Sequence, residues 1–346
     1  MMNFEDYLLE QLHIHPSIQP QDIVKLCYQA AFGGEHLLKD KDKARVYLEE
    51  EYQTAQPQDM KLYERISQDV CRIHLSAWKR KGYPIDWLFQ MFVSSFITKE
   101  NSQEVFLKYL NISEKLIKYT HFSIQEWQEY MKKYKKLGMP AVHHSLQYQQ
   151  QGQPSYRIVD AKYIRLLPIL DEIMKQNNQM CIIAIDGRAA SGKSTIAKQL
   201  QNILEADIIH MDDFFLPMHL RSEERLYEAG GNIHYERFQE EVLPFLRQSK
   251  SFSYYIFDCS QMNYHGKRTI KSKHIRIVEG SYSCHPIFSN YANITVFSTI
   301  DSQEQMKRII HRNGNKMAKI FQDKWIPLEE KYFEYYSIEH NVDICV

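Results

Sequence analysis

The sequence lacks the features that mark several common protein classes. Its 346 residues include six cysteines, no two of which form a CxxC pair, so a zinc ribbon or thioredoxin-type motif is not expected. No apolar stretch reaches the ~20 residues needed to span a bilayer. The 43 basic residues are balanced by 43 acidic ones, so the basic excess typical of a general nucleic-acid-binding surface is missing.

The amino-terminal segment MMNFEDYLLEQLHIHP is acidic, with no basic region followed by an apolar one. We therefore expect no signal peptide. The sparse cysteines lie mostly in apolar contexts, as free buried thiols do in a reducing compartment. Together these features predict a cytoplasmic protein that binds neither membranes nor nucleic acid. They leave its oligomeric state open.

The length favours two domains, at roughly 100–200 residues each. Residues 1–155 predict a mostly α-helical domain, because apolar residues recur at helical spacing in several segments. Residues 156–346 predict an α/β domain, because short apolar runs alternate with helical segments. The Gln-rich segment 146–154 is the expected connection. A helix over 156–174 is expected to lead into the second domain.

In the N-terminal domain, Asp22 is the expected N-cap of a helix that ends at Gly33-Gly34. Further helices are expected over 65–81, 85–97 and 123–136. Several histidines stand beside turns, where they form either a metal or acid–base cluster or, more commonly, isolated packing side chains. No pair has HExxH spacing. The histidines are His13, His15, His36, His143 and His144, and Glu35 stands beside His36.

Five short apolar runs in the C-terminal domain are typical of buried parallel strands. They predict a mainly parallel sheet flanked by helices, with strands over 181–186, 206–211, 275–280, 294–299 and 342–346.

The first of these strands leads into the sequence GRAASGKST, which satisfies the phosphate-loop pattern G-x-x-x-x-G-K-[ST]. Glycines let backbone N–H groups turn towards phosphates, and the following helix adds its positive dipole end. We expect Lys193 to reach the β and γ phosphates and the Ser194 hydroxyl to ligate Mg²⁺. The expected cofactors are thus ATP and Mg²⁺, bound by Gly187, Arg188, Ala189, Ala190, Ser191, Gly192, Lys193, Ser194 and Thr195.

Carboxylates end two of the other predicted strands. Asp212 and Asp213 follow one strand, and Glu279 ends another. Ligands of open α/β sheets gather at the carboxyl ends of the strands. One carboxylate there could accept the proton of a hydroxyl acceptor, and another could hold Mg²⁺. Asp212 and Glu279 are the candidates, with Asp213 as a neighbour that supports them. Strand-end capping is the alternative.

A basic helical segment follows the strand over 294–299. Arg308 and Arg312 are four residues apart and share a helix face, and Lys316 and Lys319 follow. Arginines that close over phosphates neutralise the charge that develops in the transition state. A solvated helix face is the alternative interpretation.

These motifs together resemble the uridine kinase, phosphoribulokinase and pantothenate kinase group of P-loop kinases. IDGRAASGKST resembles that group's phosphate loop, and RIIHRNG (308–314) its arginine-bearing lid helix. HMDDFF (210–215) and VEGSYSCHP (278–286) resemble its two acidic segments, which implies Asp212 as catalytic base and Glu279 near the metal. WIPLEEKYF (325–333) is similar to a stretch of bacterial uridine kinase-like proteins. The resemblance covers roughly residues 175–346.

The acceptor region departs from that group. In GGNIHYERF (230–238), His234 stands where an Asp for a sugar hydroxyl is expected, and 254–261 lacks the Tyr…His pattern of nucleoside-binding members. Arg237 either pairs with an anionic acceptor or forms a structural salt bridge. His234 and Arg237 are the substrate-binding candidates. In the N-terminal half, FGGEHLL and VHHS resemble segments of bacterial proteins, a similarity that implies no function.

The sequence therefore predicts an ATP-dependent kinase that phosphorylates a hydroxyl of a small metabolite. One alternative is a true uridine or cytidine kinase, which the acceptor segment around His234 disfavours. Another is an ATP-gated binding module with little phosphotransfer, which the retention of both Asp212 and Glu279 disfavours.

Overall fold

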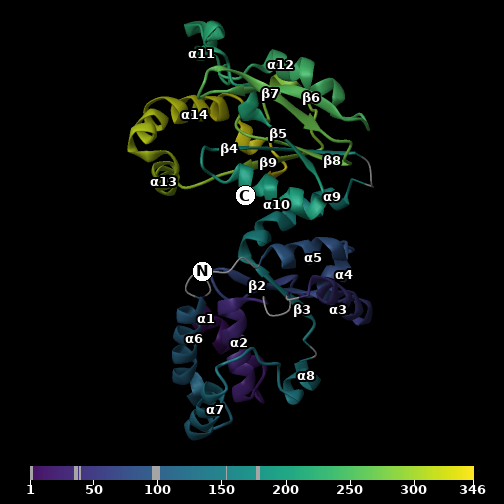
Figure 1. Cartoon of the computed structure of the whole chain (residues 1–346), viewed down its shortest axis with the longest axis vertical. Coiled ribbons are helices and arrows are strands. Elements are labelled where there is room, and N and C mark those ends of the chain that lie inside the picture. Colours follow the sequence, from purple (N-terminus) through teal and green to yellow (C-terminus); the bar gives the residue numbers. More distant parts are fainter. Residues whose placement is uncertain (1–2, 35–37, 39, 96–101, 153, 177–179) are drawn as a thin grey trace. The chain divides into compact units, whose positions relative to one another are not determined.

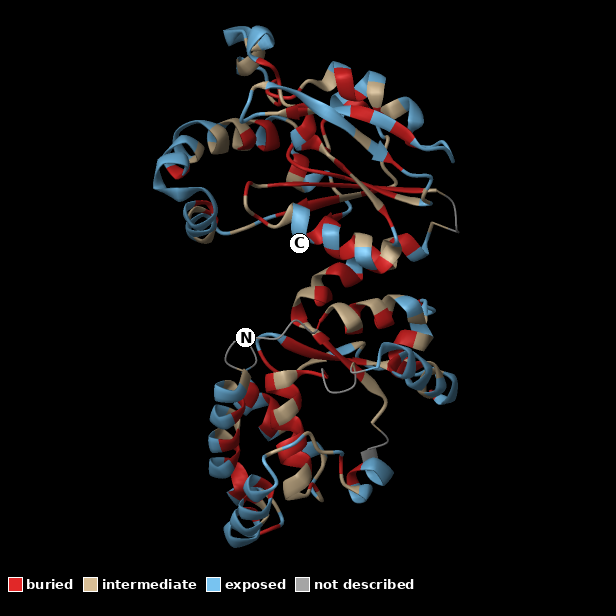
Figure 2. Cartoon of the chain, viewed as in Figure 1, coloured by how far each residue is buried: buried red, intermediate tan, exposed pale blue. Residues whose placement is uncertain are grey.

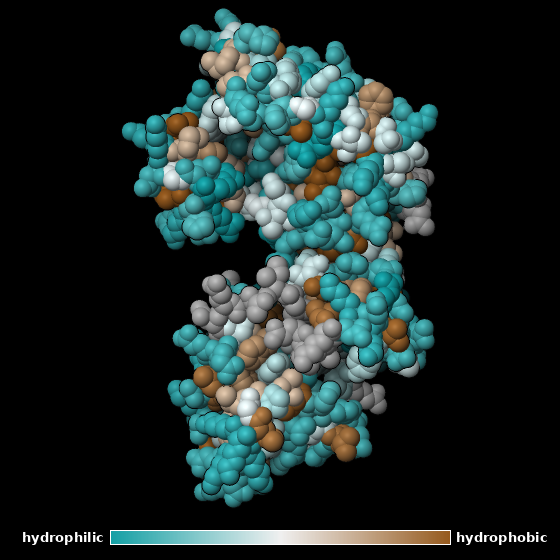
Figure 3. Space-filling model, viewed as in Figure 1, coloured by the Kyte–Doolittle hydropathy of each residue, from teal (hydrophilic) through white to brown (hydrophobic). Residues whose placement is uncertain are grey.

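The computed structural model describes residues 3–34, 38, 40–95, 102–152, 154–176 and 180–346 (Figure 1). It divides into two compact units, Met1–Ile164 and Arg165–Val346. Among the described residues, no helix combines the length and apolar character that a bilayer crossing requires. The surface seen in Figure 3 is mainly hydrophilic, with apolar side chains scattered over it.

The N-terminal unit is largely helical, as predicted. In it, α2 packs against α1, α6 and α7 around a core that includes Ile23, Leu26, Cys27, Phe106 and Trp127. The helices are α1 (Phe4–Ile14), α2 (Pro20–Phe32), α3 (Lys41–Thr54), α4 (Leu75–Lys81), α5 (Ile85–Ser94), α6 (Ser102–Leu116), α7 (Ile124–Lys136) and α8 (Leu146–Gly152).

A small antiparallel sheet in this unit was not predicted. It contains β1 (Tyr63–Arg65), β2 (Val70–His74) and β3 (Tyr156–Asp160), in that order. The predicted helix over 65–81 is wrong in its first half, and the one over 156–174 is wrong at its start. β2 and β3 are far apart in the sequence, so their pairing leaves no local signal. The segment 146–154, predicted as the connection between the domains, contains the helix α8.

The first turn of α2 also differs from the prediction. Asp22 is not its N-cap: Gln19 takes that position and Pro20 begins the helix. The Asp22 carboxylate instead reaches back to accept a hydrogen bond from the Gln19 N–H at 3.0 Å. The predicted end at Gly33 is confirmed, since this residue adopts φ 64°, which favours glycine.

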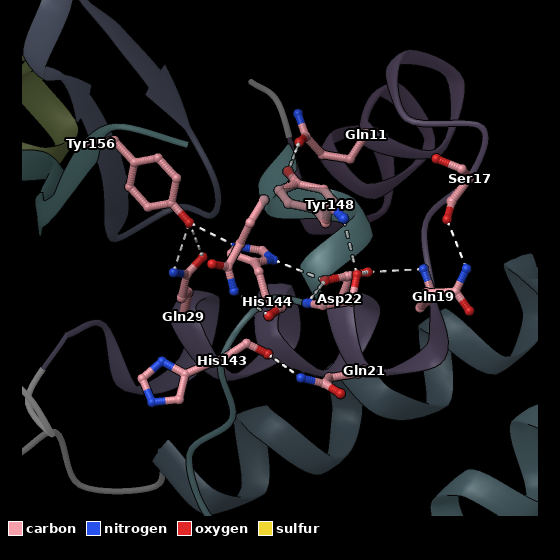
Figure 4. A network of polar contacts seen from close by, with 12 residues as sticks. Gln11, Ser17, Gln19, Gln21, Asp22, Gln29, His143, His144, Tyr148 and Tyr156 are labelled. Carbon is pink, nitrogen blue, oxygen red and sulfur yellow. Dashed lines mark hydrogen bonds and ion pairs between the residues drawn. The ribbon is translucent and has the colours of Figure 1, made fainter. Parts of the chain in front are cut away.

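Asp22 connects α2 to the segment that precedes α8 (Figure 4). Its side chain is fully buried. It accepts hydrogen bonds from the backbone N–H and the hydroxyl of Ser145, both at 2.7 Å, and lies 3.2 Å from Nδ1 of His144. Burial acts to raise the pKa of Asp22, but the hydrogen bonds from His144, Ser145 and Gln19 outweigh it and lower the pKa.

The C-terminal unit is built on a five-stranded sheet in which every neighbouring pair is parallel. The strand order is β10-β9-β4-β8-β5, and all seven residues of the central strand are buried (Figure 2). The predicted α/β fold is therefore confirmed. The strands are β4 (Cys181–Gly187), β5 (Asp207–His210), β8 (Ile275–Glu279), β9 (Ile294–Ser298) and β10 (Ile344–Cys345).

Helices cover both faces of this sheet. In Figure 1, α9 (Leu167–Met174) and α10 (Lys193–Leu204) lie along one face. On the other side lie α12 (Tyr235–Glu241) and an antiparallel hairpin of β6 (Phe252–Asp258) and β7 (Asn263–Ile270), which was not predicted. The remaining helices are α11 (Glu223–Tyr227), α13 (Ser302–Ile320) and α14 (Ile326–Tyr335).

We expect Asp22→Ala to destabilise the protein by about 2–4 kcal/mol, because it leaves buried N–H and hydroxyl donors without an acceptor. Chemical denaturation followed by circular dichroism measures the change. Asp59→Ala is the matched control: Asp59 is exposed, and we expect a change within about 0.5 kcal/mol. Equal effects of the two substitutions would show that the Asp22 contacts contribute little.

Candidate active site

The predicted phosphate loop connects β4 to α10, at the carboxyl end of the central strand. Gly187 and Gly192 adopt φ values of 136° and 108°, which side chains rarely allow. Gly187 also packs against the end of β9, where an added Cβ would lie 2.1 Å from the Ser298 carbonyl oxygen. Glycine is therefore required at position 187 by backbone conformation and by space.

Lys193 folds back over the loop. Its ammonium donates hydrogen bonds to the carbonyl oxygens of Gly187 at 2.6 Å and Arg188 at 2.9 Å. These bonds hold the ammonium at the loop, where the backbone N–H groups and the start of α10 supply further positive potential. The arrangement suits a ligand with several phosphate oxygens.

Ser194 and Glu279 lie side by side. The Ser194 hydroxyl donates to Glu279 Oε2 at 3.0 Å, and the other Glu279 oxygen contacts Nδ1 of His210. Glu279 is buried at the end of β8. Hydroxyl and carboxylate oxygens are the donors that Mg²⁺ prefers, so this pair fits the metal expected beside a nucleotide.

Asp212 lies on the turn after β5, across from Glu279. Gly280 allows this approach, because a Cβ there would lie 2.9 Å from the Met211 Cβ and 3.5 Å from Asp212 Oδ1. The pKa of Asp212 is raised, first because the surrounding protein displaces water and then because the Glu279 carboxylate is near; Lys193 opposes the shift. The side chain remains reachable from solvent.

Asp213 points elsewhere. Its carboxylate is buried and accepts hydrogen bonds from the Tyr254 hydroxyl at 3.0 Å and from Nε of Arg268 at 2.9 Å. Both partners belong to the β6–β7 hairpin, so Asp213 anchors the hairpin next to Asp212.

Lys193, Ser194, Asp212 and Glu279 line a pocket of about 760 Å³. The pocket also includes Arg308 and Arg312, both exposed on α13. Arg308 pairs with Glu304 at 3.0 Å and reaches towards the Ala190 carbonyl oxygen at 3.4 Å. The structure thus brings together the loop, Asp212, Glu279 and both arginines. Lys316 and Lys319 follow a kink at Gly314 and are not among the lining residues.

Three of the predicted site residues are not among those that line the pocket, and their roles in binding stay predictions. The Arg188 guanidinium turns away from it to pair with Glu330 at 2.9 Å and Glu339 at 3.1 Å. Arg237 is buried, forms an ion pair with Glu241 at 2.7 Å and donates a hydrogen bond to a backbone carbonyl oxygen. These contacts give it a structural role. His234 also lies outside the pocket lining, before the start of α12.

Glu329 is a site residue that the sequence did not reveal. It reaches in from α14 and accepts hydrogen bonds from the Ala189 N–H at 2.9 Å and the Ser281 hydroxyl at 2.7 Å. Burial raises the pKa of Glu329, and Lys193 counters this. Neighbouring Glu330 turns outward to Arg188, and only the orientation of the folded helix distinguishes the two. His210, which contacts Glu279, was likewise not predicted.

Neither the models of known protein families nor the curated proteins give a match. Among solved structures, a protein described as a possible uridine kinase from Bacillus stearothermophilus aligns with 53% of this chain and 98% of its own, at 19% identity and a TM-score of 0.41. A candidate fructose transport system kinase from Silicibacter sp. TM1040 aligns with 52% of this chain and 96% of its own, at 17% identity and a TM-score of 0.43. Identity this low transfers no activity, so function rests on the site itself.

We expect Lys193→Ala to weaken Mg·ADP binding by at least roughly tenfold, because it removes the charged donor at the loop. Isothermal titration calorimetry measures the affinity. Lys198→Ala provides the control, since Lys198 is exposed on the same helix and lies outside the pocket lining. Unchanged affinity in Lys193→Ala would refute the assignment of the loop as a phosphate site.

Proposed function

We propose that this protein is an ATP-dependent phosphotransferase that phosphorylates a hydroxyl of a small metabolite. The observation that carries the proposal is one pocket in which two acidic strand ends, Asp212 and Glu279, face the phosphate loop with its Lys193 and Ser194. A module that only senses nucleotide needs no acceptor base, whereas a kinase needs a carboxylate beside the site of the γ-phosphate.

In this proposal the loop N–H groups and Lys193 bind the β and γ phosphates of ATP. Ser194 and Glu279 would hold Mg²⁺, which when bound neutralises charge on the phosphate oxygens. His210 orients Glu279 through its second carboxylate oxygen. Glu329 fixes the loop by accepting the Ala189 N–H, so the binding geometry exists before the nucleotide arrives.

Asp212 is the proposed general base. Its carboxylate accepts the proton of the acceptor hydroxyl while the acceptor oxygen bonds to the γ phosphorus. The bond from that phosphorus to the oxygen bridging to the β phosphate breaks, and ADP leaves. The raised pKa of Asp212 strengthens it as a proton acceptor. Arg308 and Arg312 neutralise the charge that develops on the transferred group.

The acceptor carries a hydroxyl and is small enough for the pocket. A nucleoside is the alternative acceptor, and no contact of His234 or Arg237 supports one: Arg237 is already paired with Glu241, and His234 does not line the pocket. We therefore propose a broader class of hydroxyl acceptors and leave nucleosides as one arm of the test.

The test is ADP release from Mg·ATP across nucleosides, pantothenate, sugars, sugar phosphates and amino-alcohols. We expect one acceptor class to stimulate release. Asp212→Asn should retain ATP affinity and lower kcat by roughly 100-fold or more, because the base acts in the transition state. Asp323→Asn, at an exposed position outside the pocket lining, should leave kcat unchanged. Tight ATP binding without stimulation by any acceptor would instead favour the nucleotide-gated module.

The raised pKa of Asp212 also predicts an effect on stability. The folded protein holds a proton on Asp212 more tightly than the unfolded chain, so the stability that Asp212 contributes is present below its ordinary pKa of 3.8 and is lost as pH rises through the folded pKa. Asparagine does not ionise. Asp212→Asn should therefore raise the thermal midpoint at about pH 7, and the gain should shrink as the pH falls towards 3.8. Differential scanning fluorimetry measures both, and a lower midpoint at pH 7 would contradict the prediction.

A further inference from the structure

The N-terminal unit contains a pocket of its own, with a volume of about 950 Å³. Its walls come from the C-terminal part of α1, from the end of α3 and the segment that follows it, from β1, β2 and β3, and from α8. All of its lining residues fall between positions 10 and 156, so it is independent of the proposed kinase site. Within the described part of the chain, no group of three His, Cys, Asp or Glu side chains could hold a metal ion.

Arg72 in the wall of this pocket is a buried cation with too few partners. Its side chain is 3% exposed, and a guanidinium does not lose its charge in a protein. Nη2 donates to Gln29 Oε1 at 2.8 Å, but Nη1 lies 3.6 Å from Glu64, and Nε has no hydrogen-bond partner. Glu64 is itself shared with the Gln11 amide at 2.7 Å. A buried charge without full hydrogen bonding is costly unless a ligand supplies what is missing.

Arg72 is nevertheless held firmly. Its guanidinium lies 4.3 Å from the centre of the Tyr156 ring and 5.4 Å from that of Tyr7. Arginine stacked on aromatic rings keeps its planar donors in one orientation. A fixed and incompletely paired guanidinium suits the recognition of carboxylate or phosphate oxygens.

A chain of hydrogen bonds extends from Arg72 to Asp22, and Figure 4 shows its part from Gln29 to Asp22. Arg72 donates to Gln29, whose amide nitrogen donates to the Tyr156 hydroxyl at 3.0 Å. That hydroxyl lies 3.0 Å from Nε2 of His144, and Nδ1 of His144 lies 3.2 Å from Asp22. Because Asp22 can only accept, Nδ1 carries the proton and Nε2 accepts from Tyr156.

Each bond along this chain therefore runs from a donor to an acceptor, with a cation at one end and a carboxylate at the other. Such a polarised network strengthens each of its bonds and fixes each side chain. Gln29, Tyr156, His144 and Asp22 act as positioning residues for Arg72. Support of this kind is a feature of preorganised binding sites.

The other charges around the pocket favour an anion. Lys61 and Arg65 line it together with Arg72, against the two acids Glu10 and Glu64. His74 also lines it, and burial together with the nearby Arg72 lowers the pKa of His74 to about 4. His74 is therefore neutral near pH 7 and offers a hydrogen bond without adding charge.

We propose that this pocket binds a small anionic metabolite whose carboxylate or phosphate group pairs with Arg72. The remaining volume and the polar lining accommodate further hydroxyl or amide groups of the same molecule. The N-terminal unit is then a ligand-binding domain in its own right.

The test uses the full chain carrying Lys193→Ala, so that the phosphate loop does not take up the probe. Equilibrium dialysis with inorganic phosphate and, separately, with malonate measures the affinity and the number of sites. We expect one of the two probes to bind at one site per chain. Phosphate alone would indicate a phosphate ester as the natural ligand, and malonate alone a carboxylic acid.

Two variants in that background locate the site. Arg72→Gln should weaken binding of the active probe by roughly tenfold or more, the expected loss for a charged hydrogen-bonding group. Lys61→Glu reverses an exposed charge at the pocket, leaves the core untouched, and should also weaken binding. If Arg72→Gln does not fold, binding to the Lys61→Glu variant alone tests whether the probe occupies this pocket.

Lys108→Glu is the matched control, because Lys108 is exposed on α6 in the same unit and does not line the pocket. It should bind the probe as the parent does. Failure of both probes to bind the parent would overturn the proposal. So would binding of the probe that neither Arg72→Gln nor Lys61→Glu weakens, because Arg72 would then serve only the packing of the unit.

Discussion

The phosphate loop depends on Asp186, a buried carboxylate near the end of the central strand. It accepts hydrogen bonds from the backbone N–H groups of Tyr282 at 3.1 Å and Cys284 at 2.9 Å, and from the Tyr332 hydroxyl at 2.9 Å. Three parts of the chain therefore meet one side chain: β4, the turn after β8, and α14. Burial raises the pKa of Asp186, while its hydrogen bonds and Lys193 act against this. The position of the loop relative to Glu279 follows from these contacts.

Buried carboxylates recur as organising groups. Glu329 fixes the loop backbone from α14, and Asp22 fixes a distant segment against α2 in the other unit. Each accepts backbone N–H bonds, which satisfy donors that would be costly to bury alone. This acceptance of backbone N–H bonds distinguishes Asp186, Glu329 and Asp22 from Asp212. Asp212 accepts no such set of bonds and remains reachable from solvent, which its proposed role as a base requires.

The two units differ in how much of them the sequence revealed. The strands of the parallel sheet were predicted, because buried parallel strands are continuous apolar runs. β2 and β3 were not, because their partners are far apart in the chain and β2 runs directly into α4. In the site, the loop, Asp212, Glu279 and the arginines of α13 were identified from motifs. Glu329 and His210 were not, and the choice between the two predicted roles of Arg237 was left open, since each depends on which way a helix or turn faces.

By itself, the sequence determined the local chemistry of this protein: a phosphate loop after a buried strand, acids at two other strand ends, and two arginines on one helix face. These follow from residue type and spacing, which act over a few residues. Tertiary structure decided which of those groups share a pocket, since that depends on strand order and helix orientation. It also decided that Arg72, Tyr156, His144 and Asp22, dispersed along the N-terminal half, form one chain of hydrogen bonds. No local pattern encodes such a chain, because each of its bonds joins elements brought together only by folding.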